Sequence, residues 1–330
     1  MADEILKYLG NPTAKDGVFI DAFCGTGVVA SKAADFGWDI EVNDMMKNAV
    51  VVSESRLISK DEAPFVPFNG YENTLQILNN QSKEGFIWRE YSPASLSYAQ
   101  IERKYFTEEN AKKIDGASKL IHEWHSAKFI TDKESTLLLA SLIYAVNNVA
   151  NIAGTYGCFL SKWTRQALNE FKIEPLELRS NKVNYTVSSD DVFSIKCQPN
   201  DIVYLDPPYT KRQYASYYHI LETIVEGDEP KVEGVSGLRP WKTKSSVFCY
   251  KTKALDAMTN LVLSLNADRV LISYSNDGHI FLDDLVTNLQ CSGEVDVIEL
   301  GSIGKYRPNP TASENGSQVT EYLIDFRKAN

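Results

Sequence analysis

The feature that most constrains the fold of this chain is the stretch Asp201-Ile-Val-Tyr-Leu-Asp206-Pro207-Pro208-Tyr209. Its first half is an unbroken run of β-branched, aromatic and aliphatic residues, which is typical of a central parallel strand covered on both faces. Pro207 then holds Asp206 in an extended conformation, and Pro208 holds Pro207 in the same way, so neither a helix nor a sheet ladder can continue. The stretch therefore predicts a buried strand that ends in a stiff turn.

That turn fixes one carboxylate, the proline carbonyls and the ring of Tyr209 relative to one another. Open α/β sheets bind ligands in the crevice beyond the carboxyl ends of their strands. An Asp-Pro pair alone would be interpreted as a strand-ending turn with a capping aspartate. All four residues together, placed after such a strand, favour a functional site.

A second ligand-binding pattern lies near the start of the chain, where an apolar strand ending at Asp21 runs into Gly25 and Gly27 and then into a predicted helix. Glycine at these positions permits a sharp turn and a close approach of the backbone to a ligand. The next predicted strand, at about 39–42, is followed by Asp44, which is placed to bind the ribose hydroxyls of an adenosine-containing ligand. Taken alone, this half also fits a relaxed dinucleotide fingerprint, so a nicotinamide-dependent enzyme remains an alternative.

Composition limits the classes of protein that the chain can belong to. A length of 330 residues with 43% hydrophobic residues is enough for a sizeable core. There is no apolar run of membrane-spanning length and no signal-peptide pattern, so we expect a soluble, cytoplasmic protein that does not use a membrane. The five cysteines are scattered without Cys-x-x-Cys spacing, and His122 and His125 lack the spacing of a metal motif, so no metal site is predicted.

The net charge of −10 does not by itself indicate a nucleic-acid partner. Local distribution matters more than the sum. Basic residues gather at Lys162 and Arg165, at Lys211 and Arg212, and again from Arg239 onward. These clusters are compatible with one basic groove, although each of them singly fits a solvated face.

Long helical patterns replace the strand signals between residues 59 and 188. Thr107 is a helix cap for residues 108–124, and Thr131 with Glu134 forms a capping box before the apolar stretch 137–149. We therefore predict an α/β protein whose catalytic domain comprises residues 1–58 and 189–330, with an inserted, mainly helical domain at 59–188.

Strand signals return around residues 185–193, and further strands are predicted at 270–273, 295–300 and 319–326. A helical pattern covers 214–225. The segment 226–246, which is rich in glycine, proline and charge, is predicted to be a long loop; such loops often cover or read a ligand.

The pattern Asp21-x-Phe23-x-Gly25-x-Gly27, followed far downstream by Asp206-Pro-Pro-Tyr209, resembles the Dam-like class of adenine-specific DNA methyltransferases from restriction-modification systems. The similarity extends to four further segments: Arg103-Lys-Tyr105-Phe106, Gly154-Thr-Tyr156-Gly157, Arg212-Gln-Tyr214-Ala-Ser-Tyr217-Tyr218-His219 and Ser273-Tyr-Ser-Asn276. The resemblance implies a Rossmann-like class I methyltransferase sheet, S-adenosylmethionine as the cofactor, and a helical insertion that recognises the target in double-stranded DNA.

The resemblance also implies roles for individual residues. The catalytic residues would be Asp206, Pro207, Pro208 and Tyr209. The cofactor would be bound by Asp21, Phe23, Gly25, Thr26, Gly27, Asp44, Asp191 and Asp206, and Asp190 could exchange roles with Asp191. Candidates for contact with the flipped base or with DNA are Lys162, Arg165, Arg212, Tyr217, Tyr218, His219, Arg239 and Ser273. Partners could include a cognate restriction endonuclease, and we expect a monomer or a weak dimer.

Two segments depart from the family pattern. Members usually carry a Tyr-x-Gly-x-Lys stretch well before the glycine strand, whereas Tyr8-Leu-Gly10-Asn-Pro12 lies almost against that strand and no lysine follows at the expected place. Either the true start lies upstream or the cofactor binds without that contact. Gly304-Lys305-Tyr306-Arg307 also matches poorly.

Three alternatives stay open at this stage. One keeps the fold and changes the acceptor to the amine of cytosine, to RNA or to a protein amide. Another is a catalytically weakened, DNA-binding relative. The third is the nicotinamide-dependent oxidoreductase, which is disfavoured because the sequence supplies no obvious acid or base for hydride transfer.

Overall fold

The computed structural model describes residues 1–13, 15–303 and 319–329, so Gly304 to Arg307 lie outside the described residues. The chain forms two compact units, which are treated separately. The sheet unit comprises Met1–Met45, Asn184–Gln213 and Ser246–Asn330, and the helical unit comprises Met46–Val183 and Tyr214–Ser245. Residues 46–58 and 214–245, which the sequence analysis assigned to the catalytic segments, therefore group by their contacts with the helical unit.

The described part of the sheet unit contains a seven-stranded sheet with the order β3-β2-β1-β4-β5-β7-β6. The strands are β1 Phe19–Asp21, β2 Ile40–Asn43, β3 Tyr185–Ser188, β4 Ile202–Leu205, β5 Arg269–Ser275, β6 Gly293–Ile303 and β7 Val319–Lys328. The first five strands are parallel to one another, whereas β7 runs antiparallel to both β5 and β6. The predicted α/β class, with a mostly parallel sheet, is confirmed.

Strands β1 and β4 lie side by side in the middle of this sheet, and every residue of both is buried. The chain leaves β1 toward β2 on one side and returns later to place β4 on the other side. Phe19 pairs with Ile202 and Asp21 with Tyr204, so the carboxyl ends of the two strands are adjacent. Such a reversal of strand order is where open α/β sheets open a ligand-binding crevice.

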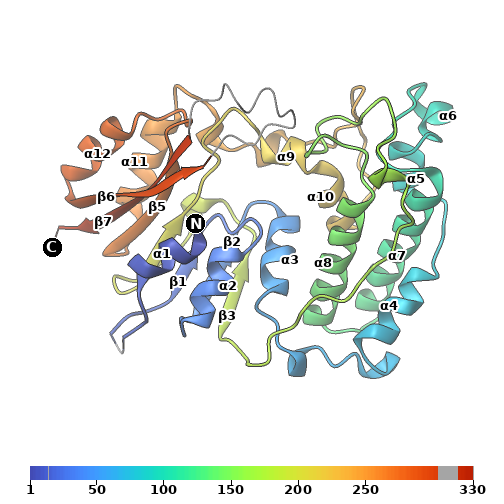
Figure 1. The fold of residues 1–330 in the computed structure, drawn as a ribbon, viewed down its shortest axis with the longest axis horizontal. Helices are drawn as coiled ribbons and strands as arrows, with labels where there is room; N and C mark the ends of the chain where they lie inside the picture. Colours follow the sequence, from blue (N-terminus) through green and yellow to red (C-terminus); the bar gives the residue numbers. More distant parts are fainter. Residues whose placement is uncertain (14, 304–318, 330) are drawn as a thin grey trace. The chain divides into compact units, whose positions relative to one another are not determined.

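Helices and short 3-10 turns complete the sheet unit: α1 Ala2–Leu9, α2 Val28–Asp35, η4 Val192–Ser194, η6 Val247–Cys249, α11 Ala254–Ser264 and α12 Leu282–Gln290. In Figure 1, α11 and α12 lie beside the orange and red strands β5, β6 and β7, which come last in the sequence. Met258 and Leu261 of α11 belong to the same buried apolar cluster as Val203 of β4 and Val270 of β5. This cluster fixes the central strands from one face.

The helical unit consists of α3 Lys47–Ser55, η1 Lys60–Glu62, η2 Val66–Phe68, α4 Tyr71–Asn79, α5 Phe86–Tyr91, α6 Ser95–Ala99, α7 Glu108–Ser126, α8 Asp132–Asn148, η3 Gln166–Leu168, α9 Tyr214–Tyr217, α10 His219–Glu226 and η5 Lys242–Lys244. Both predicted caps are confirmed, since the Thr107 side chain accepts from Asn110 N and Thr131 forms a capping box with Glu134. No helix among the described residues is long and apolar enough to cross a membrane.

Buried Glu222 is one of the residues that tie 214–245 to the helical unit. Its carboxylate accepts hydrogen bonds from Lys47 N at 3.2 Å and Asn48 N at 2.9 Å, which are the first two backbone amides of α3. The amides at a helix start lack partners within the helix, and a carboxylate there is also favoured by the helix dipole. Lys244 Nζ bonds the same carboxylate at 2.5 Å, so both ends of the 214–245 segment converge on it.

We expect Asp201→Ala to destabilise the sheet unit. Asp201 is 8% exposed, and its two oxygens accept from Val18 N at 2.8 Å and Gln198 N at 2.7 Å, which ties the start of β4 to the start of β1. Removing a charged acceptor from two backbone amides should lower the free energy of unfolding by about 2–4 kcal/mol. Urea unfolding would measure this loss, with exposed Asp39→Ala as the matched control. Equal stabilities of the two variants would contradict this assignment.

Candidate active site

The loop after β1 is a glycine turn that leaves one face of the backbone open. Gly25 and Gly27 have φ values of 49° and 72°, a region that residues with a side chain rarely adopt. Gly27 N donates to Cys24 O at 2.7 Å, and α2 begins at the next residue. A Cβ atom on Gly25 would meet only Phe23 O, at 3.9 Å. This open face allows a ligand to approach the backbone closely.

Asn43, at the end of β2, holds three strand ends together and is 1% exposed. Its Nδ2 donates to Ala22 O at 3.2 Å and to Asp190 O at 3.1 Å, and its Oδ1 accepts from Ser188 Oγ at 2.9 Å and Asp190 N at 3.0 Å. The sequence analysis did not identify Asn43 as a site residue. The signal in the sequence was an asparagine at the end of a predicted buried strand, because its side-chain amide can both donate and accept hydrogen bonds.

Two of the predicted cofactor-binding acids lie at these strand ends. Asp44 is half-buried, and its Oδ2 accepts from Gly25 N at 3.2 Å, so its carboxylate lies against the glycine turn. Asp191 is exposed and caps η4 by accepting from Phe193 N at 3.0 Å. Asp190 is also exposed, and its backbone is bonded to Asn43, so the choice between Asp190 and Asp191 stays open.

A row of three aromatic rings lies beside Asp191. Phe193 stacks on Phe248 with centroids 6.0 Å apart and an interplanar angle of 6°, and Phe248 meets Phe23 edge-on at 5.5 Å. Phe193 is 47% exposed, so its ring offers a flat apolar surface to solvent. Sequence reasoning did not identify Phe193 as a site residue. Its position two residues after an exposed acid was the only signal.

The turn after β4 presents the predicted catalytic residues. Asp206 is solvent-accessible, Pro207 is buried, and Pro208 and Tyr209 are half-buried. The Tyr209 ring meets the Tyr274 ring at 5.5 Å and 65°, and Tyr209 O accepts from His279 N at 2.8 Å. Tyr274 of β5 therefore contacts the Tyr209 ring, and the segment after β5 holds the Tyr209 backbone.

Ser273 is buried beneath this turn, where it bonds to the strand that leads into it. It is 3% exposed, and its Oγ lies 2.7 Å from the buried Tyr204 hydroxyl of β4. Ser273 therefore bonds two neighbouring strands to each other, and its contact with a base stays a prediction. Sequence alone could not show which face of β5 Ser273 occupies.

Carboxylates gather where β1 and β4 end. Asp21 is 2% exposed, and its Oδ1 has no hydrogen-bond partner among the described residues. Burial raises the pKa of Asp21 to about 8, and repulsion from Asp206 and Asp44 adds to the shift, while the backbone N–H groups of Ala30 and Phe23 oppose it. Asp206 is accessible to solvent, but desolvation by the surrounding protein raises its pKa to about 7. Repulsion from the Glu321 carboxylate makes a smaller contribution. The site suits a ligand that brings positive charge.

Two residues predicted to contact DNA, His219 and Arg239, bond to other residues of the helical unit. His219 is fully buried, its Nε2 lies 3.0 Å from Tyr156 O, and burial lowers its pKa to about 4, so it is neutral. Arg239 donates to both oxygens of Asp228 at 3.0 Å and to Thr223 Oγ1 at 3.0 Å. Both groups have partners within the protein, and their contact with DNA stays a prediction.

The remaining candidates are more accessible. The Tyr217 ring lies over Gly157, where a Cβ atom would come within 2.9 Å of it, and Tyr218 sits at the break between α9 and α10. Lys162, Arg165 and Arg212 are exposed and form no ion pair with other described residues. Lys162 and Arg165 belong to the helical unit, and Arg212 belongs to the sheet unit.

Two other segments have structural partners of their own. Gly10, in the stretch that departs from the family pattern, follows α1, and its carbonyl accepts from Trp38 Nε1 at 2.9 Å. In α7, His122 Nε2 lies 2.9 Å from Ile224 O, and His125 pairs with Asp132 at 2.8 Å. Each of these residues therefore has a hydrogen-bond or ion-pair partner within its own unit.

Comparison with known proteins adds a family to this geometry. A family model described as "D12 class N6 adenine-specific DNA methyltransferase" matches residues 1–276. The chain is 32% identical to the type II methyltransferase M.FokI of Planomicrobium okeanokoites, over 94% of this chain and 48% of that protein. It is 34% identical to the modification methylase LlaI of Lactococcus lactis subsp. lactis, over 98% of this chain and 55% of that protein.

A third relative, the type II methyltransferase M.NlaIII of Neisseria lactamica, is 29% identical over 98% of this chain and 95% of that protein. The chain thus spans about half the length of M.FokI and LlaI, and nearly the whole of M.NlaIII.

Asp21 generates a prediction about stability and pH. Because the pKa of Asp21 is about 8 in the folded state and lies in the ordinary range when unfolded, the folded state keeps a proton that the unfolded state loses. Stability should therefore fall as pH rises from about 4 to 8. Asp21→Asn resembles the protonated acid and should remove this fall, so its melting temperature should exceed that of wild type increasingly toward pH 8.5. Exposed Asp256→Asn is the control, and a pH-independent difference for Asp21→Asn would contradict the raised pKa.

Proposed function

Because the chain belongs to the D12 class of N6 adenine-specific DNA methyltransferases, we propose that it transfers a methyl group from S-adenosylmethionine to the exocyclic N6 amine of a flipped adenine in double-stranded DNA. The observation that carries the proposal is the adjacency of two turns at the centre of the sheet. The glycine turn after β1 lies next to the Asp206-Pro-Pro-Tyr209 turn after β4, since Asp21 pairs with Tyr204. One turn would hold the methyl donor and the other would hold the acceptor.

The residues around the glycine turn fit the proposed cofactor. Asp44 would bind the ribose hydroxyls, and Asp191 with the exposed Phe193 ring would bind the adenine. Phe23, Gly25, Thr26 and Gly27 would surround the methionine moiety, and the open face of Gly25 leaves room for it. When bound, S-adenosylmethionine supplies an electrophilic methyl group on a positively charged sulfur. The carboxylates of Asp21 and Asp206, both with a raised pKa, favour such a charge over a neutral ligand.

The acceptor half follows from the chemistry of adenine. The lone pair of its exocyclic amine is delocalised into the ring, so the amine is a poor nucleophile. A carboxylate at Asp206 and the carbonyl of Pro207 would each accept a hydrogen bond from one amine N–H, which lets the nitrogen become pyramidal and directs its lone pair at the methyl group. As the new C–N bond forms, the C–S bond would break to leave a neutral thioether, and the methylated amine would then lose one N–H proton. The rigid prolines hold these acceptors in place before the reaction, and such preorganisation is the larger part of the catalytic effect.

Tyr209 would stack on the base once it has left the duplex. Its ring is held edge-on against Tyr274, and the Tyr209 carbonyl is bonded to the segment after β5. A stacked base gains about 1–3 kcal/mol, which offsets part of the few kcal/mol that unstacking costs. The Tyr209 ring is therefore assigned to the binding of the flipped adenine.

The helical unit is proposed to recognise the target sequence, with Lys162 and Arg165, together with Arg212 of the sheet unit, on phosphates. Unpaired, exposed cations of this kind position a protein on DNA without reading its sequence. The relatives M.FokI, LlaI and M.NlaIII are named as type II methyltransferases or modification methylases. By analogy, we propose that this chain protects DNA against a cognate restriction endonuclease.

Asp206→Ala tests the acceptor role. With labelled S-adenosylmethionine and duplex DNA, the variant should lose at least about 10²–10³-fold in kcat/KM, because a preorganised acceptor is removed. Exposed Asp284→Ala is the control for general effects of losing an acid, and mass spectrometry of the nucleosides identifies N6-methyladenine as the product. An active Asp206→Ala protein, or a methylated cytosine as the product, would contradict the proposal.

The same acceptor predicts a pH dependence. Asp206 is a strong hydrogen-bond acceptor when ionised and a much weaker one when protonated, and its pKa in the free protein is about 7. The value of kcat/KM should therefore fall about tenfold per unit below that pH and level off above it. A flat profile between about pH 5.5 and 8 would contradict an Asp206 that titrates near neutrality.

A further inference from the structure

A short hairpin turn at residues 234–237 stands out within the long loop of the helical unit. Glu233 and Leu238 form a bridge, with Glu233 N donating to Leu238 O at 2.9 Å and Leu238 N donating to Glu233 O at 2.8 Å. Gly234 and Gly237 have positive φ values of 72° and 65°. A Cβ atom on Gly237 would come within 2.9 Å of Arg103 Nε, so glycine is required there on two grounds.

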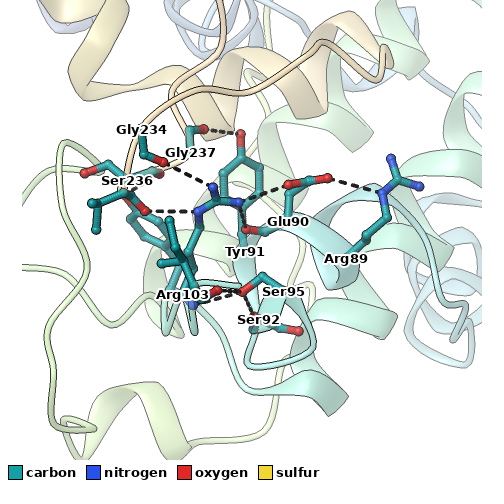
Figure 2. A network of polar contacts seen from close by, with 12 residues as sticks. Arg89, Glu90, Tyr91, Ser92, Ser95, Arg103, Gly234, Ser236 and Gly237 are labelled. Atoms are coloured by element: carbon teal, nitrogen blue, oxygen red, sulfur yellow. Dashed lines mark hydrogen bonds and ion pairs between the residues drawn. The ribbon is translucent and has the colours of Figure 1, made fainter. Parts of the chain in front are cut away.

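Buried Arg103 holds the first half of this turn (Figure 2). Its Nε donates to Val235 O at 3.0 Å and its Nη2 donates to Gly234 O at 3.2 Å. Its Nη1 donates to Glu90 O at 3.1 Å and to Glu90 Oε2 at 3.0 Å. The side chain is only 3% exposed. A guanidinium is expensive to bury unless such bonds satisfy it, so Arg103 is committed to this place.

Two buried tyrosines hold the second half. The Tyr91 hydroxyl donates to Gly237 O at 2.9 Å (Figure 2). The Tyr105 hydroxyl lies 3.0 Å from Ser236 O and 2.9 Å from Tyr156 O. Both tyrosines are fully buried. Side chains from a distant part of the sequence thus bond the carbonyls of Gly234, Val235 and Gly237, and the single hydroxyl hydrogen of Tyr105 is shared between Ser236 O and Tyr156 O.

This arrangement directs the other groups of the turn outward. With its carbonyls held against the core, the turn leaves the Val235 side chain 62% exposed and the Ser236 side chain partly exposed. None of residues 234–237 carries a charge. A fixed surface turn binds a partner without first losing conformational entropy, which raises affinity. The turn is therefore a preorganised, neutral contact surface.

We propose that the 234–237 turn contacts base edges of the duplex DNA substrate through Val235 and Ser236, and that Arg103 is its positioning residue. The proposal rests on the proposed function, which supplies DNA as the partner. Contacts to phosphate come chiefly from cations and make binding salt-dependent, whereas apolar and hydroxyl groups suit the base edges, including the thymine methyl group. A neutral turn should therefore contribute to sequence discrimination and leave the salt dependence unchanged.

The test begins by sequencing DNA methylated by the full chain, which gives its recognition sequence. Binding to a duplex with that sequence, and to duplexes with single substitutions, is then measured for wild type, Val235→Ala and Ser236→Ala at several salt concentrations. In Val235→Ala and Ser236→Ala, we expect Kd for the cognate duplex to rise about five- to tenfold. The ratio of Kd for a singly substituted duplex to Kd for the cognate duplex should fall by a similar factor. The slope of log Kd against log salt should stay as in wild type.

Two comparison variants make these results specific. Val66→Ala shortens a similarly exposed valine of η2 in the same unit, which is 73% exposed, and should behave as wild type. Lys162→Ala should instead reduce the salt slope by about one and leave discrimination unchanged. Unchanged binding and discrimination in Val235→Ala and Ser236→Ala would overturn the proposal, and so would a changed salt slope.

Arg103→Lys tests the positioning role, because lysine keeps the charge and loses the planar fork of donors. It should narrow discrimination as Val235→Ala does, with kcat for the cognate duplex near that of wild type. If Arg103→Lys does not fold, the two surface variants still decide. Wild-type protein that methylates no DNA would instead refute the proposed function, and the turn proposal with it.

Discussion

The parallel pairing of β1 with β4 is the constraint on which the rest of the sheet unit depends. Asp21 pairs with Tyr204, and Ala22 N donates to Tyr204 O at 3.0 Å, so the ladder extends to the residue just before the glycine turn. Two turns that lie 180 residues apart in the sequence therefore emerge side by side. Asp21 and Asp206 come close enough to repel each other, and this repulsion appears mainly at Asp21, the more deeply buried acid.

Both units use buried polar side chains to organise backbone that is neither helix nor strand. Asn43 joins three strand ends, Glu222 caps α3, and Arg103 holds the 234–237 turn. Each side chain satisfies several backbone groups that would be costly to bury alone. The irregular segments bonded by Asn43 and Arg103 are the ones that carry the proposed contacts with the cofactor and DNA.

Short-range patterns in the sequence predicted the parts of the fold that depend on neighbouring residues. The strand before Asp206 and the Thr131 capping box follow from adjacent residues alone, and both are confirmed. Long-range partners could not be predicted in this way. His219 and Arg239 look like ligand-binding residues in the sequence, but in the structure they bond to Tyr156 and Asp228. Residues 214–245 group with the helices in part because Glu222 bonds to the start of α3.

The central claim is that acids at the ends of β1 and β4 form a site for a positively charged methyl donor. Calorimetric titration in buffers of different ionisation enthalpy measures the protons released on binding. At pH 7, S-adenosylmethionine should release about one proton, because its sulfonium lowers the raised pKa of Asp21 and Asp206. The uncharged thioether product, S-adenosylhomocysteine, should release clearly less. Equal proton release by the two ligands, or none by either, would contradict the claim.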